Sequence, residues 1–446
     1  MRGKTRHRIS RPHPRGARKN PARQRRRILR PGSGSQAPGE APIDLYIDHQ
    51  CPQCGAPAVL AESDRLYRCG YCRVQSYLLP RDVPPFRLPS PPSAAAPLSY
   101  VPYWRFKGMV FSCRAAGIDH RFVDVSRCAL EGEGFPETLG LRPQAMPLKP
   151  VTPESQGRFL APTLSRRCLL EQFGAPRSAA EQADLYWRAP IGESLSLIYA
   201  PVYRKERVYD AVLQRPLAGV PENLDLERLN AGPPQGHLRF VPAICPQCGW
   251  DLEGRSDSLV LLCRHCQRAW QARRRGLEKI PIAHLPRPSD ASLHLPFWRI
   301  RAAVQGLPLA SHADLVRLAN LPRVVRAAWE TDPFRFWFPA FKIRPKSMLH
   351  LARSLTLGQP AATLAERLPP GEIFPVNLPL EEAVESLKIL LAAFAKPYHQ
   401  IRSRLAQIRI TPQAMLLVYI PFYATAHEYL QPDWHLSLNR RHLSLD

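Results

Sequence analysis

Two groups of four cysteines with the same internal spacing constrain this chain more than any other feature. In each group, two Cys-x2-Cys pairs are separated by fourteen residues, and the first pair reads Cys-Pro-Gln-Cys-Gly. Pro fixes one backbone φ and Gly tolerates a positive φ, so each short turn can bring two sulfurs toward one ion. The groups are Cys51, Cys54, Cys69 and Cys72, then Cys245, Cys248, Cys263 and Cys266.

Four thiolates from two such turns can surround an ion tetrahedrally, which is the closed geometry of structural zinc. The sequence therefore predicts two structural zinc ions, one in each group, with no open coordination position for catalysis. Iron in a rubredoxin-type site usually needs a longer spacer, and the ferredoxin cysteine run is absent. A redox Cys-x2-Cys would need one reactive pair instead of two matched pairs. The other cysteines, Cys113, Cys128 and Cys168, are expected to be small buried apolar residues.

These residues resemble the zinc-ribbon family. The features that carry the resemblance are the CPxCG turn, an apolar strand before the second cysteine pair and an aromatic residue after it. They occur as Leu66–Arg68 with Tyr77, and as Leu259–Leu262 with Trp270. The resemblance covers the cysteine modules alone, and it implies a short, mostly antiparallel β-module around each zinc ion.

The cysteine groups belong to a longer internal repeat. Val101–Phe106 returns as Leu295–Ile300 at the same offset of 194 residues that relates the cysteines. Leu197–Tyr203 returns as Leu417–Tyr423 at an offset of 220, so the second copy has gained 26 net residues. We expect the extra residues between Leu307 and Lys396, where helical patterns are more frequent.

We therefore expect an α+β protein arranged as a tandem duplication, each half a zinc ribbon followed by a β-rich body with helices. The expected parts are a basic disordered arm at 1–41, ribbons at 42–80 and 236–280, a β-rich body at 98–230 and an α+β body at 290–446. Apolar patterning predicts strands at Trp104–Cys113, Ser194–Tyr203 and Arg207–Leu213. It predicts helices at Ala179–Trp187, His312–Trp329, Leu380–Ala395 and Tyr398–Ile408.

Net charge favours nucleic-acid binding less than its value of +25 suggests. The first thirty residues hold thirteen Arg or Lys and no acid, so one arm supplies more than half of the charge. That arm is either a polyanion-binding segment or a disordered tail without such a role. Between the cysteine pairs the first ribbon has no net charge and the second is acidic, whereas phosphate binding needs basic side chains. The charged residues there are Glu62, Asp64, Arg65 and Arg68, then Asp251, Glu253, Arg255 and Asp257.

A basic stretch follows the second ribbon, with Trp270 inside it. The stretch is either a nucleic-acid patch with a stacking aromatic, or a solvated linker in which Trp270 packs the ribbon. Its members are Arg264, Arg268, Arg273, Arg274, Arg275 and Lys279. The repeated aromatic residues, such as Trp104 and Trp298, are expected to be core, with a ligand groove as the alternative.

Sequence motifs of catalysis and membrane insertion are absent. There is no phosphate-binding loop, no dinucleotide-binding fingerprint, no HExxH and no GxSxG. No apolar run is long enough to span a membrane, and the basic arm does not read as a signal peptide. We expect a cytoplasmic, non-catalytic zinc-ribbon protein that acts as a scaffold or adaptor for an unidentified protein partner. The alternative is a nucleic-acid-binding protein that uses the basic arm and Arg273–Arg275.

Overall fold

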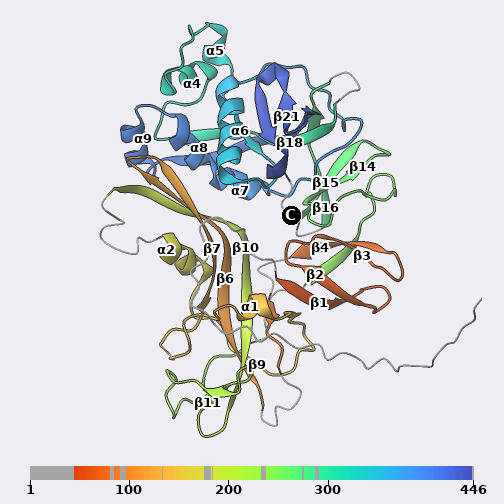
Figure 1. Ribbon diagram of the computed structural model, residues 1–446, viewed down its shortest axis with the longest axis vertical. Coiled ribbons are helices and arrows are strands. Elements are labelled where there is room, and N and C mark those ends of the chain that lie inside the picture. Colours follow the sequence, from red (N-terminus) through yellow and green to blue (C-terminus); the bar gives the residue numbers. More distant parts are fainter. Residues whose placement is uncertain are drawn as a thin grey trace, which may run out of the picture. The chain divides into compact units, whose positions relative to one another are not determined.

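Long antiparallel strands dominate the computed structural model (Figure 1), which confirms the α+β class. The structure describes residues 45–443 except 81–84, 91–96, 133, 175–181, 183, 233–237, 274–275 and 287–290. The predicted basic arm and the patch residues Arg274 and Arg275 lie outside the described residues. Residues Ala41–Asp446 form a single compact unit, and everything below concerns that unit.

The first large sheet is built on two strands, β6 (Ser99–Arg114) and β10 (Leu185–Arg204). They pair antiparallel, and the predicted strands Trp104–Cys113 and Ser194–Tyr203 lie within them. β7 (Ile118–Cys128) pairs with the other edge of β6, and β5 (Pro85–Arg87) runs parallel to β10. Shorter members are β8 (Lys149–Pro150), β9 (Arg158–Phe159), β11 (Val208–Asp210) and β12 (Arg215–Pro216). The predicted strand at Arg207–Leu213 is realised only as β11.

The second large sheet is built on β18 (Leu293–Gln305) and β20 (Arg409–Ala424), which also pair antiparallel. Trp298 lies opposite Leu417 in this pair, as Trp104 lies opposite Leu197 in the first sheet. A short strand again runs parallel to the later long strand, here β17 (Ile282–His284) against β20. The sheet also contains β19 (Phe336–Pro339), β21 (Glu428–Gln431) and β22 (Leu436–Asn439).

Helices gather around the second sheet. They are α4 (His312–Leu318), α5 (Ala328–Thr331), α6 (Pro345–Gly358), α7 (Leu380–Glu385), α8 (Leu387–Phe394) and α9 (Tyr398–Arg404). Most lie between Leu307 and Lys396, where the sequence predicts extra residues. The largest buried apolar cluster lies between these helices and the sheet, and it takes in Trp298, Leu351 and Leu391. The first sheet carries the short α1 (Arg142–Ala145) and α2 (Arg166–Gly174).

Several helix predictions need correction. The predicted helix His312–Trp329 is two helices, because Asn320 adopts a positive φ of 49° and Pro322 follows it. The predicted helix Leu380–Ala395 is divided at Ser386 into α7 and α8, and the one from Tyr398 ends at Arg404. Of the predicted helix Ala179–Trp187, residues 185–187 begin β10, because Leu185 and Trp187 pair with β6.

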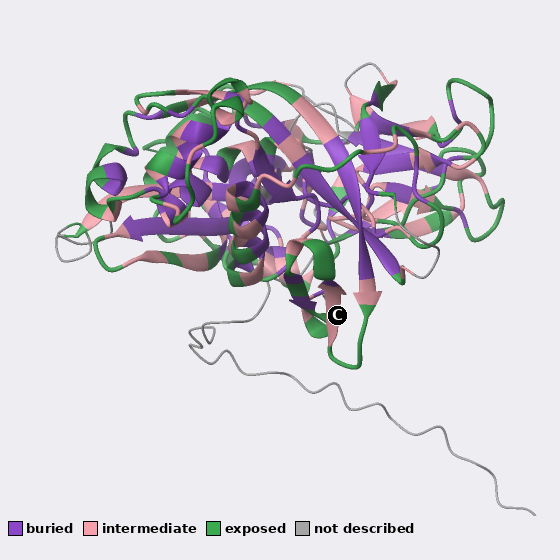
Figure 2. Ribbon diagram, turned by 90° about the horizontal axis from the view of Figure 1, so that it is seen from above, coloured by how far each residue is buried: buried purple, intermediate pink, exposed green. Residues whose placement is uncertain are grey.

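The two cysteine modules share a small sheet. The first contains β1 (Tyr46–Gln50) paired with β2 (Pro57–Ala61), and β3 (Leu66–Arg68) paired with β4 (Gln75–Pro80). β13 (Leu238–Pro242), which precedes the second cysteine group, pairs with β4 of the first. The second module continues with β14 (Val260–Cys263), β15 (Arg268–Arg273) and β16 (Gly276–Ile280). One apolar cluster joins the modules, including Tyr77, Leu252 and Trp270. Figure 2 shows that the buried residues of the chain concentrate on the long strands of the sheets.

Candidate metal centres

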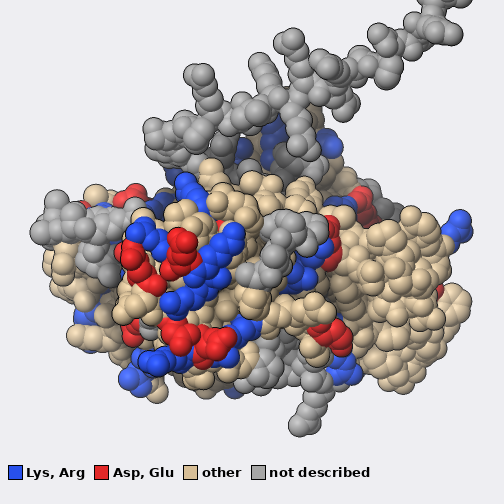
Figure 3. Space-filling model, turned by 90° about the horizontal axis from the view of Figure 1, so that it is seen from below, with Lys and Arg blue, Asp and Glu red and all other residues tan. Residues whose placement is uncertain are grey.

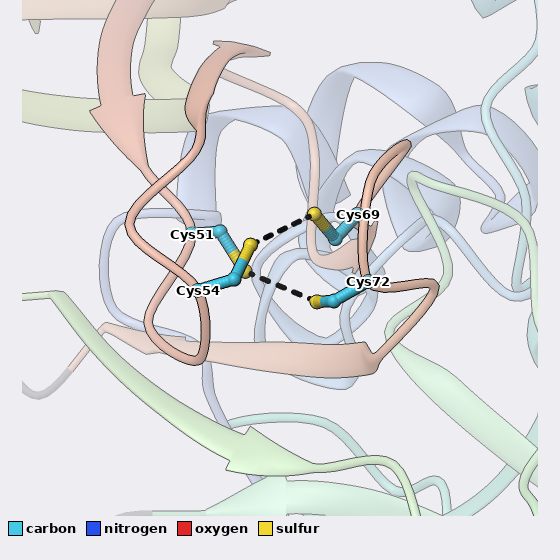
Figure 4. A group of neighbouring side chains, drawn as sticks. All are labelled: Cys51, Cys54, Cys69 and Cys72. Carbon is cyan, nitrogen blue, oxygen red and sulfur yellow. Dashed lines mark hydrogen bonds between the residues drawn. The ribbon is translucent and has the colours of Figure 1, made fainter.

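The four sulfurs of each cysteine group converge. In the first group, Cys51 Sγ lies 3.8 Å from Cys72 Sγ, and Cys54 Sγ lies 3.7 Å from Cys69 Sγ (Figure 4). All four sulfurs lie within 4.8 Å of one another. A tetrahedron with Zn–S bonds of about 2.3 Å has edges of about 3.8 Å, so these spacings fit a zinc ion.

The second group repeats this arrangement. Cys245 Sγ lies 3.6 Å from Cys266 Sγ, and Cys248 Sγ lies 3.5 Å from Cys263 Sγ. All eight predicted ligands are therefore brought together in two sets of four. Among the described residues, these are the two groups of three or more His, Cys, Asp or Glu side chains that could hold an ion.

Backbone geometry explains why the turns bring the sulfurs together. Gly55 and Gly249 both have a φ of 72°, which is the conformation that the CPxCG motif requires of its glycine. Gly55 N–H donates to the Cys51 carbonyl at 2.9 Å, and Gly249 N–H donates to the Cys245 carbonyl at the same distance. The turns around the second cysteine pairs instead place a non-glycine residue at positive φ, Arg73 or Gln267.

The pKa values of the cysteine thiols in each group are compatible with binding of a cation. In the first group, the backbone N–H of Cys72 is the main cause that lowers the pKa of Cys69 to about 6. In the second group, burial and the neighbouring sulfurs raise the pKa of Cys266 to about 12. One thiolate thus forms readily, whereas further ionisation brings like charges together. A divalent ion removes that repulsion, which suits the group to zinc.

The segments between the two cysteine pairs of each module, residues 55–68 and 249–262, are called the tips here. Both tips contact other parts of the chain. The Glu62 side chain is 8% exposed and accepts hydrogen bonds from Arg105 at 2.7 and 2.8 Å, although a carboxylate is ordinarily solvent-exposed. In the second module, Asp257 accepts from Asn377 at 2.6 Å, and the Leu259 N–H donates to the Val376 carbonyl at 2.7 Å. These contacts cross long stretches of sequence, so no local pattern indicates them.

The tips also contact each other. Arg65 and Leu66 each donate a backbone N–H to the Ser256 carbonyl, at 2.6 and 2.8 Å. The buried Tyr77 hydroxyl donates to the Ser258 carbonyl at 2.9 Å. Because each tip is held by the other and by the sheets, the cysteine modules join parts of the chain that are distant in sequence.

The described members of the basic stretch after the second module are partly engaged. Arg264 donates to the Pro369 and Gly371 carbonyls, both at 3.0 Å, and Arg273 pairs with Glu381 at 2.9 Å. Trp270 is buried in the cluster between the modules, which agrees with a packing role. The repeated aromatics are mostly core as expected. Tyr103, Trp104, Tyr199, Tyr203, Phe297, Trp298 and Tyr419 are buried, whereas Tyr423 is half-buried.

The remaining cysteines differ in exposure. Cys113 and Cys128 are buried as expected, and burial raises the pKa of both thiols. Cys168 is exposed, so the prediction that it is buried is wrong. It lies in the third position of α2, where the two following residues face the core instead. Leu169 packs in the cluster that contains Trp104, and Leu170 packs against the cluster that contains Phe106.

Exposed apolar residues concentrate on the cysteine modules. The large hydrophobic side chains that are exposed there are Tyr46, Val59, Tyr71, Ile244 and Trp250. Trp250 is 60% exposed and stacks on His265 of the second module at 5.1 Å. On the face seen in Figure 3, charged side chains gather at the left and centre, whereas a broad area at the right carries few. That is the side on which β1 to β4 lie in Figure 1.

Comparison with known proteins finds no matching family model, curated protein or solved structure. Within the described part of the chain, no helix has both the length and the apolar character needed to cross a membrane. The chain's own geometry is therefore the basis for the proposals that follow.

Proposed function

We propose that this chain is a cytoplasmic, non-catalytic zinc-ribbon protein that serves as a scaffold or adaptor for another protein. Two zinc ions, one in each cysteine group, hold the ribbons folded and take no part in chemistry. The observation that carries the structural role is the contact of both ribbon tips with the chain's own body, through Glu62 and Asp257. Four cysteine ligands also leave no coordination position for a substrate.

We further propose that the chain arose by tandem duplication. The 194-residue offset of the sequence motifs supports this proposal, and so do matched structural details. Trp104 Nε1 donates to the Leu164 carbonyl at 2.7 Å, and Trp298 Nε1 donates to the Leu378 carbonyl at 3.1 Å. The strand pairings of β5 with β10 and of β17 with β20 are equivalent as well, each parallel and three residues long.

The exposed apolar residues of the ribbons support protein binding. Tyr71 and Trp250 are 73% and 60% exposed beside cysteine turns that hold them on a rigid frame. Large exposed aromatic side chains on a folded frame suit contact with a protein surface. We assign partner contact to the exposed apolar residues of the two ribbons, which are Tyr46, Val59, Tyr71, Ile244 and Trp250.

A pull-down from native extract tests this assignment. The bait is the zinc-loaded full chain, compared with a variant carrying Tyr71→Ser and Trp250→Ser. A matched control carries Leu213→Ser and Val324→Ser, which are exposed apolar positions away from the ribbons. The proposal expects a partner that the ribbon variant loses and the control retains; equal retention by both variants would contradict it.

The basic arm supports the alternative of nucleic-acid binding, together with Arg273–Arg275. Retention of the full chain on DNA or RNA at increasing salt, compared with a chain that starts at Pro42, separates the two functions. Steep salt dependence in the shorter chain would favour the alternative over the scaffold. Retention by the full chain alone would assign binding to the arm.

A further inference from the structure

A group of buried polar side chains lies on one face of the second sheet. His284 is 4% exposed, His294 is 5% exposed, and Tyr419 is fully buried. In the parallel pair of β17 and β20, His284 is the register partner of Tyr419. On the other side of β20, Pro296 of β18 is also a partner of Tyr419, and His294 lies two residues before it. Both histidines therefore share the sheet face of Tyr419.

Hydrogen bonding leaves one nitrogen of each ring free to act as a ligand. His284 Nδ1 lies 2.8 Å from the Arg367 carbonyl, and His294 Nδ1 lies 3.3 Å from the Glu372 carbonyl. A carbonyl only accepts, so each Nδ1 carries the proton and each Nε2 keeps its lone pair in the neutral ring. This second bond from Nδ1 to a carbonyl is the usual support for a histidine that binds a metal through Nε2.

The hydroxyl of Tyr419 completes the group. It is buried and has no hydrogen-bond partner among the described residues. A buried hydroxyl without a partner costs free energy, so such a group points to a bound ligand. With two imidazole lone pairs on the same face, this oxygen forms a set of three donor atoms.

The equivalent positions in the first sheet are filled in another way. There Arg87 is the register partner of Tyr199, and Tyr100 takes the place of His294. The Phe159 ring stacks on Tyr100 at 4.5 Å and packs edge-on against Tyr199 at 5.1 Å. In the second sheet the residue bridged to His294 is the smaller Ile373. The first sheet thus closes this face with aromatic rings, and the second places imidazoles there.

We propose that His284 Nε2, His294 Nε2 and Tyr419 Oη bind a third metal ion, a first-row divalent cation such as Zn²⁺. Imidazole nitrogens with an oxygen donor suit zinc and its neighbours in that row, whereas Mg²⁺ and Ca²⁺ prefer all-oxygen sets. The segment that carries Arg367 and Glu372 lies beside both histidines, since the backbone N–H groups of His284 and His294 donate to the Ala365 and Glu372 carbonyls at 2.9 Å.

Metal content of the purified full chain tests the proposal. After dialysis against Zn²⁺ and removal of free ion, we expect three ions per chain, and two in a variant with His284→Gln and His294→Gln. The difference of one ion does not depend on the ribbons, whose cysteines are unchanged. In a Co²⁺ titration, thiolate charge-transfer bands should saturate at two equivalents while a third binds without them.

Tyr419→Phe provides a second test in case the histidine variant misfolds, because it removes only the hydroxyl oxygen and keeps the ring. Tyr419→Phe should lower the affinity of the third site for its ion by at least about tenfold. Tyr199→Phe, at the equivalent position of the first sheet, should leave this affinity unchanged. Circular dichroism confirms folding of each variant. An equal metal content in wild type and the histidine variant would overturn the proposal and indicate a bridging water.

Discussion

The Arg105 guanidinium and the Glu62 carboxylate form a buried ion pair that joins the tip of the first ribbon to β6. Their side chains are 2% and 8% exposed, and Nη1 lies 2.7 Å from Oε2. Arg105 also pairs with Asp124 of β7 through Nε and Nη2, at 2.7 and 2.8 Å. Ser194 and Gln144 donate to the two carboxylates, so the network is well supplied with hydrogen bonds.

Arg105→Met should destabilise the protein by about 3 to 5 kcal/mol, because it leaves two buried carboxylates without their cation. Denaturant unfolding of the zinc-loaded chain measures the change. Arg167→Met is the matched control, since its pair with Glu171 is solvent-exposed and its loss should change stability little. Equal effects of the two substitutions would show that the buried pair does not hold the ribbon.

Tyr77→Phe should cost about 1 to 2 kcal/mol, because the Ser258 carbonyl loses its buried donor between the ribbons. Tyr71→Phe removes an exposed hydroxyl from the same module and serves as the control. Thermal unfolding of the zinc-loaded proteins compares them. No difference between the two variants would mean that the contact between ribbon tips adds nothing to stability.

Cys51→Ser should remove one zinc ion and unfold the first ribbon, because metal binding is coupled to folding in such modules. The shared sheet extends the damage to β13, whose partner β4 belongs to that ribbon. Elemental analysis and protease sensitivity near Leu238 measure both effects. Cys168→Ser, at an exposed cysteine outside the groups, should change neither. An unchanged zinc content in Cys51→Ser would remove the first metal site.

His312 should make the protein less stable as the pH falls below about 6.5. Burial is the main cause that lowers its pKa in the folded state. As the pH falls through about 6.5, the unfolded chain binds a proton at His312 and the folded chain does not. The folded state therefore loses stability until the pH reaches the lowered pKa of His312 in the folded chain. His312→Phe keeps a ring against Trp329 and should flatten this decline in urea unfolding at pH 7 and pH 5.5. An unaltered slope would contradict the assignment.

The convergence of the cysteines into two groups of four could be predicted because its signal is local. The CPxCG turn needs only a few residues, and the geometry at Gly55 and Gly249 follows from them. The long strands containing Trp104 and Trp298 could be predicted for a similar reason, since their apolar character continues over many residues. In each case the deciding interactions lie within one stretch of sequence.

Long-range pairing could not be predicted. Glu62 carries a carboxylate, which is ordinarily solvent-exposed, and nothing near it in sequence indicates its pairing with Arg105. The division of the predicted helix His312–Trp329 depends on the left-handed backbone of Asn320, which the apolar period does not reveal. Local patterns predict a ribbon at 42–80 and another at 236–280. They do not predict that β13 of the second pairs with β4 of the first, because this pairing depends on the whole fold.

That pairing has a consequence for synthesis on the ribosome. β4 leaves the ribosome with an open edge, and its partner β13 follows only after the whole first sheet has been made. During this interval the exposed edge can pair with another nascent chain on the same messenger RNA. Early zinc loading at Cys51 and its three partners would shorten the period of risk by holding the ribbon folded. We therefore expect early metal binding to reduce misassembly of the nascent chain.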